Sequence, residues 1–329
     1  MLVSQRFGVH SKVTQSNART LQNAKYRVRT DLGISETSYS HSEDDPIYGT
    51  GQGSGNSSQT WGFLSSVISD IYESRAAPAS YCNPDRSREL KIAMIGFVDD
   101  NNGQTNRFMV LQDRSTLEWM VARAEENATL WALLLEATGG ALELSKCSYH
   151  IVFWKFSMQG APVLTNMSSE VPPIKVTDTY TGNLQELQHL SPYTAHKTLG
   201  HHKEPAGVQA VQYKSLKEKS DSITDFLRRT PLSRTEAWTY YTACYIPSIC
   251  YPLTASFMSP KQLTDVQKKA MSIIIPQCGF NRHTHRAIIY GPRSLGGANF
   301  RLLHVEQGLL QVTYFIRHCA LTQLTCQRL

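Results

Sequence analysis

The chain has 329 residues, of which 41% are apolar and 18% charged, with a formal net charge of +6. This composition excludes a disordered polypeptide and supplies enough apolar side chains for two cored domains. Seven cysteines without paired short spacings indicate reduced thiols rather than a disulfide framework. Residues 1–30 lack the apolar core of a signal peptide. We therefore expect an intracellular protein, nuclear or cytoplasmic, that is neither secreted nor membrane-bound.

The first elements in chain order are short strands over residues 26–30 and 34–39, followed by a glycine-rich segment and a helix over 57–73. The segment Tyr48–Ser58 carries glycines that let a backbone approach a ligand closely, and the helix N-terminus after it favours phosphate. An ordinary loop before a helix is the alternative, because no Gly-Lys-Ser/Thr follows as in a phosphate-binding loop.

An apolar strand over residues 91–98 then leads to the turn sequence Asp99-Asp100-Asn101-Asn102-Gly103. A hairpin turn of Asp, Asn and Gly brings neighbouring carboxylates toward one ion. Two such charges ~4 Å apart repel by about 4 kcal/mol at an effective dielectric near 20, which a hard cation such as Mg²⁺ cancels. Plain turn chemistry is the alternative, and Asp44-Asp45 is an acidic pair without such a setting.

A helix over 117–138 carries an apolar face, and a strand over 149–157 follows the segment Thr138–Cys147 that contains Lys146. Residues 158–202 are rich in proline and hydroxyl side chains, so we predict a strand-poor connection there. Helices are expected near 206–229, 232–256, 260–275, 283–290 and 302–322. The 232–256 stretch contains Pro247 and Pro252 and is interpreted as a buried helix rather than a membrane span.

The positive charge is carried by the last part of the chain. Residues 201–329 hold 16 Lys and Arg against 7 Asp and Glu, a net charge of +9. On helices, such cations favour contacts with a nucleic-acid backbone, and a solvated basic surface is the alternative. Cysteines and histidines near residues 278–319 lack the spacing of a zinc site. The candidate backbone-binding residues are Lys214, Lys217, Lys219, Arg228, Arg229, Lys268, Lys269, Arg282 and Arg286.

In their order and spacing, these segments resemble the palm of a reverse transcriptase from a non-LTR (LINE-like) retrotransposon. The element Gly51, Gln52, Gly53 and Ser54 is similar to motif B, which lies beside the template and nascent base pair. The run Phe97-Val98-Asp99-Asp100 resembles motif C, the metal-binding hairpin. Thr138–Cys147 resembles motif D, with Lys146 near the incoming triphosphate. The likeness covers roughly residues 6–200 by motif and the remainder by a looser resemblance to helical thumb regions.

The resemblance implies an RNA-directed DNA polymerase that uses Mg²⁺ (or Mn²⁺), an RNA template, a DNA primer and deoxynucleoside triphosphates. Asp99 and Asp100 would bind the metal, and Lys146 would assist the leaving pyrophosphate. Family members also have a motif A aspartate on an earlier strand, which here would lie before Met1, and Asp31 is a poor substitute. Because two-metal transfer needs carboxylates from more than one segment, we expect the chain to be inactive alone.

The expected fold is α+β, with an incomplete polymerase palm of antiparallel sheet and packed helices, followed by an all-helical thumb-like domain. The partial palm would span residues 1–160, the connection 161–204 and the basic helical region 205–329. Two other hypotheses stay open. One is a non-catalytic nucleic-acid-binding module that rests on the basic helices, and the other is an inert remnant of a retroelement.

Overall fold

A computed structural model of the chain describes residues 2–31, 33–41, 57–83, 85–97, 100–106, 114–165, 171–179, 181–281 and 283–325. The described part is α+β and divides into two compact units, Met1–Ser191 and Pro192–Leu329. The division falls inside the connection expected over 161–204. Each unit has its own buried core, so each is described by itself.

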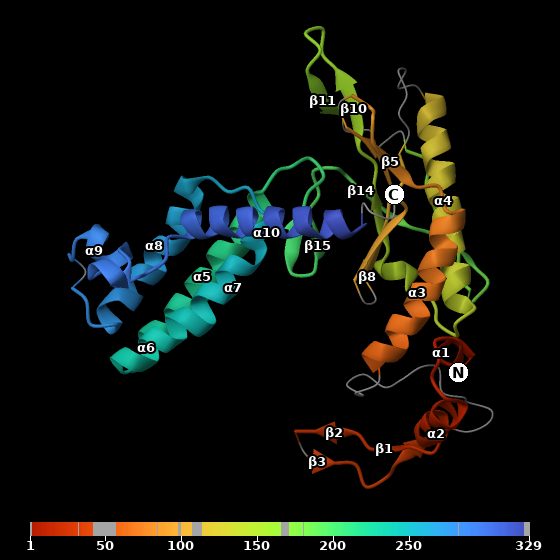
Figure 1. The fold of residues 1–329 in the computed structure, drawn as a ribbon, viewed down its shortest axis with the longest axis horizontal. Coiled ribbons are helices and arrows are strands. Elements are labelled where there is room, and N and C mark those ends of the chain that lie inside the picture. The colour runs from red at the N-terminus through yellow and green to blue at the C-terminus, as the bar shows by residue number, and fades with distance from the viewer. Residues whose placement is uncertain are drawn as a thin grey trace. The chain divides into compact units, whose positions relative to one another are not determined.

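The first unit is built on two long helices, α3 (Ser57–Arg75) and α4 (Arg114–Glu136), which pack against each other (Figure 1). Both helices confirm sequence predictions to within a few residues. Tyr72 of α3 meets Trp131 of α4 edge-on, with ring centroids 5.4 Å apart, beside the buried Ala93. The other end of α4 packs Leu117 and Val121 on a second apolar cluster. Shorter helices in this unit are α1 (Leu2–Arg6), α2 (Ser11–Gln22) and the 3-10 turn η1 (Leu144–Lys146).

The strands described in the first unit are short and form two-stranded pairs. The antiparallel pairs join β1 (Lys25–Tyr26) to β4 (Tyr39–Ser40), β2 (Arg29–Thr30) to β3 (Gly33–Ile34), β5 (Ala79–Cys82) to β6 (Glu89–Ile92), β7 (Met94–Phe97) to β8 (Asp100–Gly103), β10 (Phe153–Phe156) to β11 (Pro162–Thr165) and β12 (Lys175–Thr177) to β13 (Leu184–Glu186). The remaining pair, β9 (Ser148–His150) with β14 (Gln188–Leu190), is parallel.

The strands expected over 26–30, 34–39 and 149–157 are each interrupted, and two further expectations about strands are wrong. The single strand predicted over 91–98 is broken at Ala93, whose buried carbonyl accepts a hydrogen bond from the Gln104 backbone at 2.8 Å, outside both flanking strand pairs. The strand-poor connection predicted over 158–202 carries several strands, because Pro162 takes the first position of β11 and Pro172, Pro173 and Pro192 lie outside the strands. The last of these strands, β15 (His196–Thr198) and β16 (His201–Lys203), pair in the second unit.

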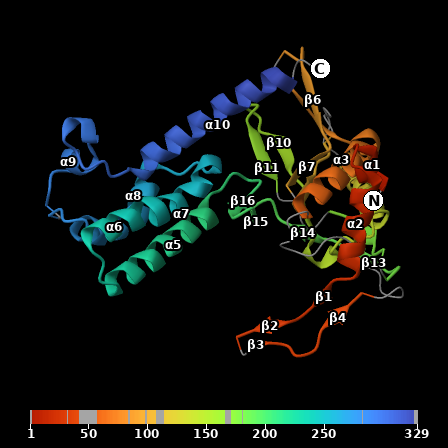
Figure 2. The ribbon, with the colours of Figure 1, turned by 60° about the horizontal axis from the view of Figure 1, so that its bottom comes forward.

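The second unit is helical apart from that hairpin, and its long helices lie side by side (Figure 2). Its helices match those expected from the sequence, with the 232–256 stretch divided into four segments. They are α5 (Ala210–Arg229), α6 (Arg234–Tyr240), the π-helical turn η2 (Tyr241–Tyr245), α7 (Ile246–Cys250), η3 (Tyr251–Ala255), α8 (Pro260–Gln277), α9 (Arg286–Tyr290), η4 (Arg293–Leu295) and α10 (Leu303–Thr325).

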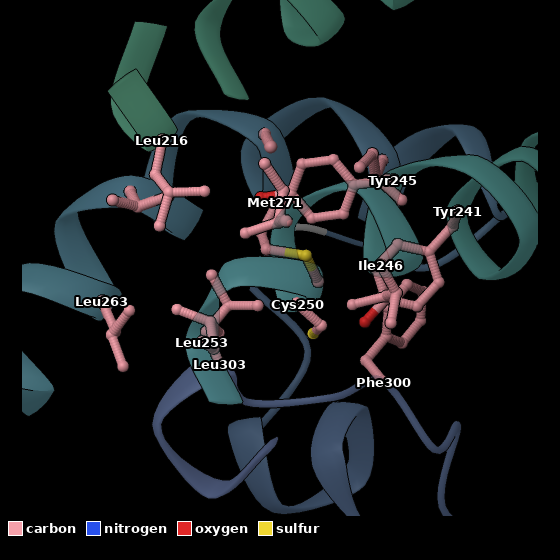
Figure 3. Close-up of a cluster of buried hydrophobic side chains, with 14 of the residues drawn as sticks. Leu216, Tyr241, Tyr245, Ile246, Cys250, Leu253, Leu263, Met271, Phe300 and Leu303 are labelled. Atoms are coloured by element: carbon pink, nitrogen blue, oxygen red, sulfur yellow. The ribbon is translucent and has the colours of Figure 1, made fainter. Parts of the chain in front are cut away.

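A single apolar cluster joins these helices (Figure 3). Tyr241 and Tyr245 of η2 lie fully buried in it, with Leu263 of α8 and Leu303 of α10. Capping boxes start two of the helices: Ser233 with Glu236 begins α6, and Ser259 with Gln262 begins α8. Each box satisfies backbone donors that a helix start leaves open.

Prolines explain the irregular helix in the middle of this unit. Pro247 and Pro252 have no backbone N–H and crowd the carbonyl four residues earlier, which a regular α-helix does not tolerate. The chain widens to π geometry just before Pro247 and tightens to 3-10 geometry around Pro252. The Ser248 carbonyl, four residues before Pro252, accepts a hydrogen bond from Lys219 Nζ at 2.9 Å instead.

Among the described side chains of the final helix, α10, those in its first half make hydrogen bonds to the rest of the second unit. Gln307 exchanges hydrogen bonds with the Met258 backbone, and Gln311 donates to the Ser256 carbonyl at 2.7 Å. Beyond these contacts Val312, Phe315 and Ile316 are 57%, 69% and 61% exposed. No helix among the described residues combines the length and apolar character needed to cross a membrane.

Candidate functional site

The β7–β8 hairpin carries the described half of the expected metal site. Its register pairs Phe97 with Asp100 and Met94 with Gly103, so only Val98 and Asp99 separate the paired residues in sequence. Asp100 begins the return strand with an exposed side chain. Opposite Gly96 lies Asn101, whose side-chain oxygen would be 2.5 Å from a Cβ at position 96, so a larger residue there would have to displace the Asn101 side chain.

The hairpin is fastened at its base to helix α3 and strand β5. A Cβ at Gly103 would lie 3.3 Å from the Tyr72 hydroxyl, so the return strand runs directly against that ring. Burial raises the pKa of Tyr72 to about 12, which keeps the phenol neutral. Gln104 accepts a hydrogen bond from the Tyr81 hydroxyl at 2.8 Å. The arrangement holds the base rigidly and presents Asp100 at the open end.

Several of the expected site residues lie outside the described residues. They are Gly51, Gln52, Gly53, Ser54, Asp99 and Arg282, together with the side chain of Phe97. The described ranges contain no group of three or more Asp, Glu, His or Cys placed to hold one metal ion. Asp100 fits Mg²⁺ as one ligand, because this cation takes hard oxygen donors and often binds through one or two carboxylates, with water and phosphate completing its shell.

Lys146 ends the 3-10 turn η1, and its side chain is exposed. The turn is anchored by the buried Leu144, while Leu142 packs, as Met94 does, against the cluster that contains Ala93 at the base of the hairpin. The segment that bears Lys146 therefore starts from the same core as the hairpin. Glu143, the residue just before the turn, has its pKa lowered by a hydrogen bond from Ser145 and by the Lys146 charge.

Many of the expected phosphate-binding cations take part in ion pairs within the second unit. Lys217 of α5 is hydrogen-bonded to Asp265 of α8, and that bond lowers the pKa of the carboxyl. Lys269 of α8 lies 3.4 Å from both Asp221 and Asp225 of α5. These contacts tie the two helices together and reduce the positive charge that this surface offers to a ligand.

The other basic side chains differ in whether they form ion pairs or hydrogen bonds within the second unit. Lys214 pairs with Glu218 at 3.9 Å and Arg228 with Asp225 at 3.8 Å, both exposed contacts of low strength. Lys219 donates to the Ser248 carbonyl. Arg229, Lys268 and Arg286 are exposed, and no ion pair to them occurs among the described side chains. The acids at 221 and 225, spaced one helical turn apart, are the sequence signal that would have indicated this pairing.

The described cysteines, Cys82, Cys147, Cys244, Cys250 and Cys278, are free thiols. Burial raises the pKa of Cys250 to about 12 and that of Cys278 to about 11, so neither is an activated nucleophile.

Comparison with known proteins gives no family for the chain. No protein-family model matches it, and no curated protein sequence matches it either.

Proposed function

We propose that this chain is a fragment of an RNA-directed DNA polymerase from a non-LTR retrotransposon, with a palm-like first unit and a thumb-like second unit. The observation that supports this most is the β7–β8 hairpin, which presents Asp100 at the start of its return strand next to Asp99 in the sequence. A two-residue connection holds the residues at its two ends close together, and Mg²⁺ is commonly bound through one or two carboxylates.

In the intact enzyme Asp99 and Asp100 would hold Mg²⁺, which when bound supplies charge stabilisation for phosphoryl transfer. The primer hydroxyl oxygen would form a bond to the α-phosphorus of the nucleotide and lose its proton to solvent water, while the bond between that phosphorus and the oxygen bridging to the β-phosphate breaks and pyrophosphate leaves. Lys146 would neutralise the departing phosphates, and Gln52 with Gly53 would contact the template and nascent pair. The motif A aspartate expected of the family is not in this sequence, so the chain alone would bind metal without extending a primer.

Titration of the chain with Mn²⁺, followed by the loss of the free-ion paramagnetic signal, tests the metal assignment. Asp100→Asn should weaken binding about tenfold, because a charged oxygen ligand becomes a neutral one. Asp70→Asn is the matched control, since Asp70 is an exposed carboxylate on α3 of the same unit. Equal affinities of the two variants would remove the metal assignment and with it the polymerase proposal.

A further inference from the structure

A shallow pocket of about 380 Å³ lies in the second unit, where the end of α8 and the loop after α9 meet α6. Its walls are Trp238 of α6, Phe280 after α8, Arg293 and the backbone of Gly296 and Gly297. The pocket shares no lining residue with the β7–β8 hairpin or with the paired lysines of α5 and α8. It combines aromatic faces, a cation and glycine backbone within one concave surface.

The guanidinium of Arg293 is stacked over Trp238, with its central carbon 5.0 Å from the ring centroid. The indole is itself fixed by the buried Phe300, which meets it edge-on at 5.1 Å and 89°. Arg293 is exposed, and no acidic partner for it exists among the described residues. The sequence also has no Asp or Glu from residue 266 to residue 305. The outer face and the N–H groups of the guanidinium are therefore available to a ligand.

The loop that carries Arg293 is shaped by an unusually close approach of two backbone segments. A Cβ at Gly297 would lie 2.1 Å from the Gly291 carbonyl oxygen, and Gly296 has a φ of +79°. The Gly297 N–H donates to the Pro292 carbonyl at 3.0 Å, and the Asn299 N–H donates to the Gly291 carbonyl at 2.9 Å. Such a conformation persists only where the surrounding contacts hold it, and it sets Arg293 over the indole.

The chemistry of this pocket selects a flat ring that carries negative charge. A base can stack on the guanidinium or on the exposed aromatic edge, while its phosphate accepts hydrogen bonds from the guanidinium N–H groups. The volume suits one nucleotide and is too small for a duplex. We propose that the Trp238–Arg293 pocket binds a nucleotide unit of single-stranded nucleic acid. The proposal rests on the proposed function only for its class of ligand and uses none of the hairpin residues.

Fluorescence anisotropy of the full chain with a labelled oligothymidylate tests this site, using about twelve nucleotides, within the range that one small binding fold covers. Arg293→Met should weaken binding about tenfold through loss of stacking and charge, and Arg293→Lys about threefold because the charge remains. Arg88→Met is the charge-matched control at an exposed position of the first unit and should leave affinity unchanged. Equal affinities of Arg293→Met and Arg88→Met would overturn the proposal.

Competition and cross-linking identify the ligand. An oligonucleotide with 5-iodouracil should cross-link to the peptide containing Trp238 or Phe280 in the unmodified chain, and cross-linking elsewhere would overturn the site. Equal competition by uridine monophosphate at the same nucleotide concentration would show that the pocket binds a free nucleotide. That result would overturn the assignment of a nucleic-acid strand as the ligand. Equal competition by polyglutamate would overturn nucleotide recognition altogether. These binding and cross-linking measurements need no metal ion and use none of the hairpin residues, so failure of the polymerase proposal in the Mn²⁺ titration and failure of this one are distinguishable.

Discussion

Tyr245 lies fully buried in the second unit, with its hydroxyl 3.1 Å from Ser220 Oγ. Burial raises its pKa to about 12 from an ordinary value of 10.0. Burial also raises the pKa of Tyr241, whose hydroxyl accepts a hydrogen bond from the Arg301 backbone at 2.8 Å. Both phenols are kept neutral by the core that they help to form, and this links the stability of the unit to alkaline pH.

The sign of that link follows from proton binding. Below pH 10 Tyr245 keeps its proton in both states, and its contribution to stability is fully present. Between pH 10 and about 12 only the unfolded chain releases the proton, so the free energy of unfolding falls as pH rises through this range. Tyr245→Phe should lessen this fall by about 1.4 kcal/mol per pH unit, with Tyr314→Phe on the exposed part of α10 as control. Urea unfolding at several alkaline pH values measures both slopes, and identical slopes would refute the linkage.

Two neighbouring lysines on α8 differ in whether they form ion pairs. Lys269 lies between Asp221 and Asp225, whereas Lys268 is exposed and influences Asp265 only through its charge. If the second unit binds nucleic acid through its backbone, Lys268→Met should lower the slope of log affinity against log salt by about 1. Lys269→Met should change that slope less and should instead lower the stability of the α5–α8 contact. Anisotropy titrations over a series of salt concentrations measure this, and a larger slope change for Lys269→Met would contradict the assignment.

Among the elements, the loop between α9 and α10 depends most strictly on its residue types. A Cβ at Gly297 would lie 2.1 Å from the Gly291 carbonyl oxygen, and a Cβ at Gly291 would lie 2.4 Å from the Ala287 carbonyl oxygen. Gly308, in contrast, lies on an open side of α10, where an added methyl group would have nothing within 4 Å. The two sites offer a direct test of why the glycines are there.

Gly297→Ala should destabilise the second unit by roughly 1–3 kcal/mol, because the added Cβ forces apart hydrogen-bonded backbone. Gly308→Ala should stabilise it by about 0.5–1 kcal/mol, because alanine loses less conformational entropy in a helix. Thermal unfolding followed by circular dichroism compares the two variants with the parent chain. A neutral effect of Gly297→Ala would show that the loop relaxes without cost.

Helices were predictable from the sequence because their signals are local. Ser259 before Pro260, with Gln262 three residues after the serine, is a helix start that can be read from neighbouring residues. The break at Ala93 was not predictable, because its carbonyl accepts a hydrogen bond from the backbone N–H of Gln104, which follows the strand β8 later in the chain. The π turn before Pro247 was also missed, since the pattern of apolar residues continues through it.

The candidate site was predictable only in part, for the same reason. A hairpin at this position is confirmed, but the turn expected over Asp99–Gly103 is wrong, because Asp100, Asn101 and Gly103 belong to the return strand β8. The stack of Arg293 on Trp238 joins residues far apart in the chain, and no spacing rule connects them. Likewise Lys217 and Asp265 come together only because α5 and α8 pack, so a count of charge along the sequence overestimates the cations left for a ligand.

At the scale of the whole molecule, the two units have separate cores. Ile68, Tyr72 and Trp131 belong to the first unit, and the cluster from Leu216 to Leu303 belongs entirely to the second. Units of this size with their own cores can fold independently. Assignment of these units to a palm and a thumb remains a prediction of the proposed function.

Urea unfolding of the full chain should therefore show two transitions rather than one. Tyr245→Phe should move only one of them, and Trp131→Ala in the first unit should move only the other, by about 3–5 kcal/mol. Circular dichroism and tryptophan fluorescence report the two steps. A single coincident transition in both variants would mean that the units unfold together.

The exposed apolar side chains of α10 have a practical consequence for the purification of this chain. Val312, Phe315 and Ile316 form an exposed apolar surface on this helix, and Arg317 is the nearest charged residue in the sequence. Apolar surface of this kind adsorbs to column matrices, increases the fluorescence of solvatochromic dyes and promotes aggregation as the protein concentration rises. Mild detergent or a solubilising fusion partner should keep the chain dispersed during storage.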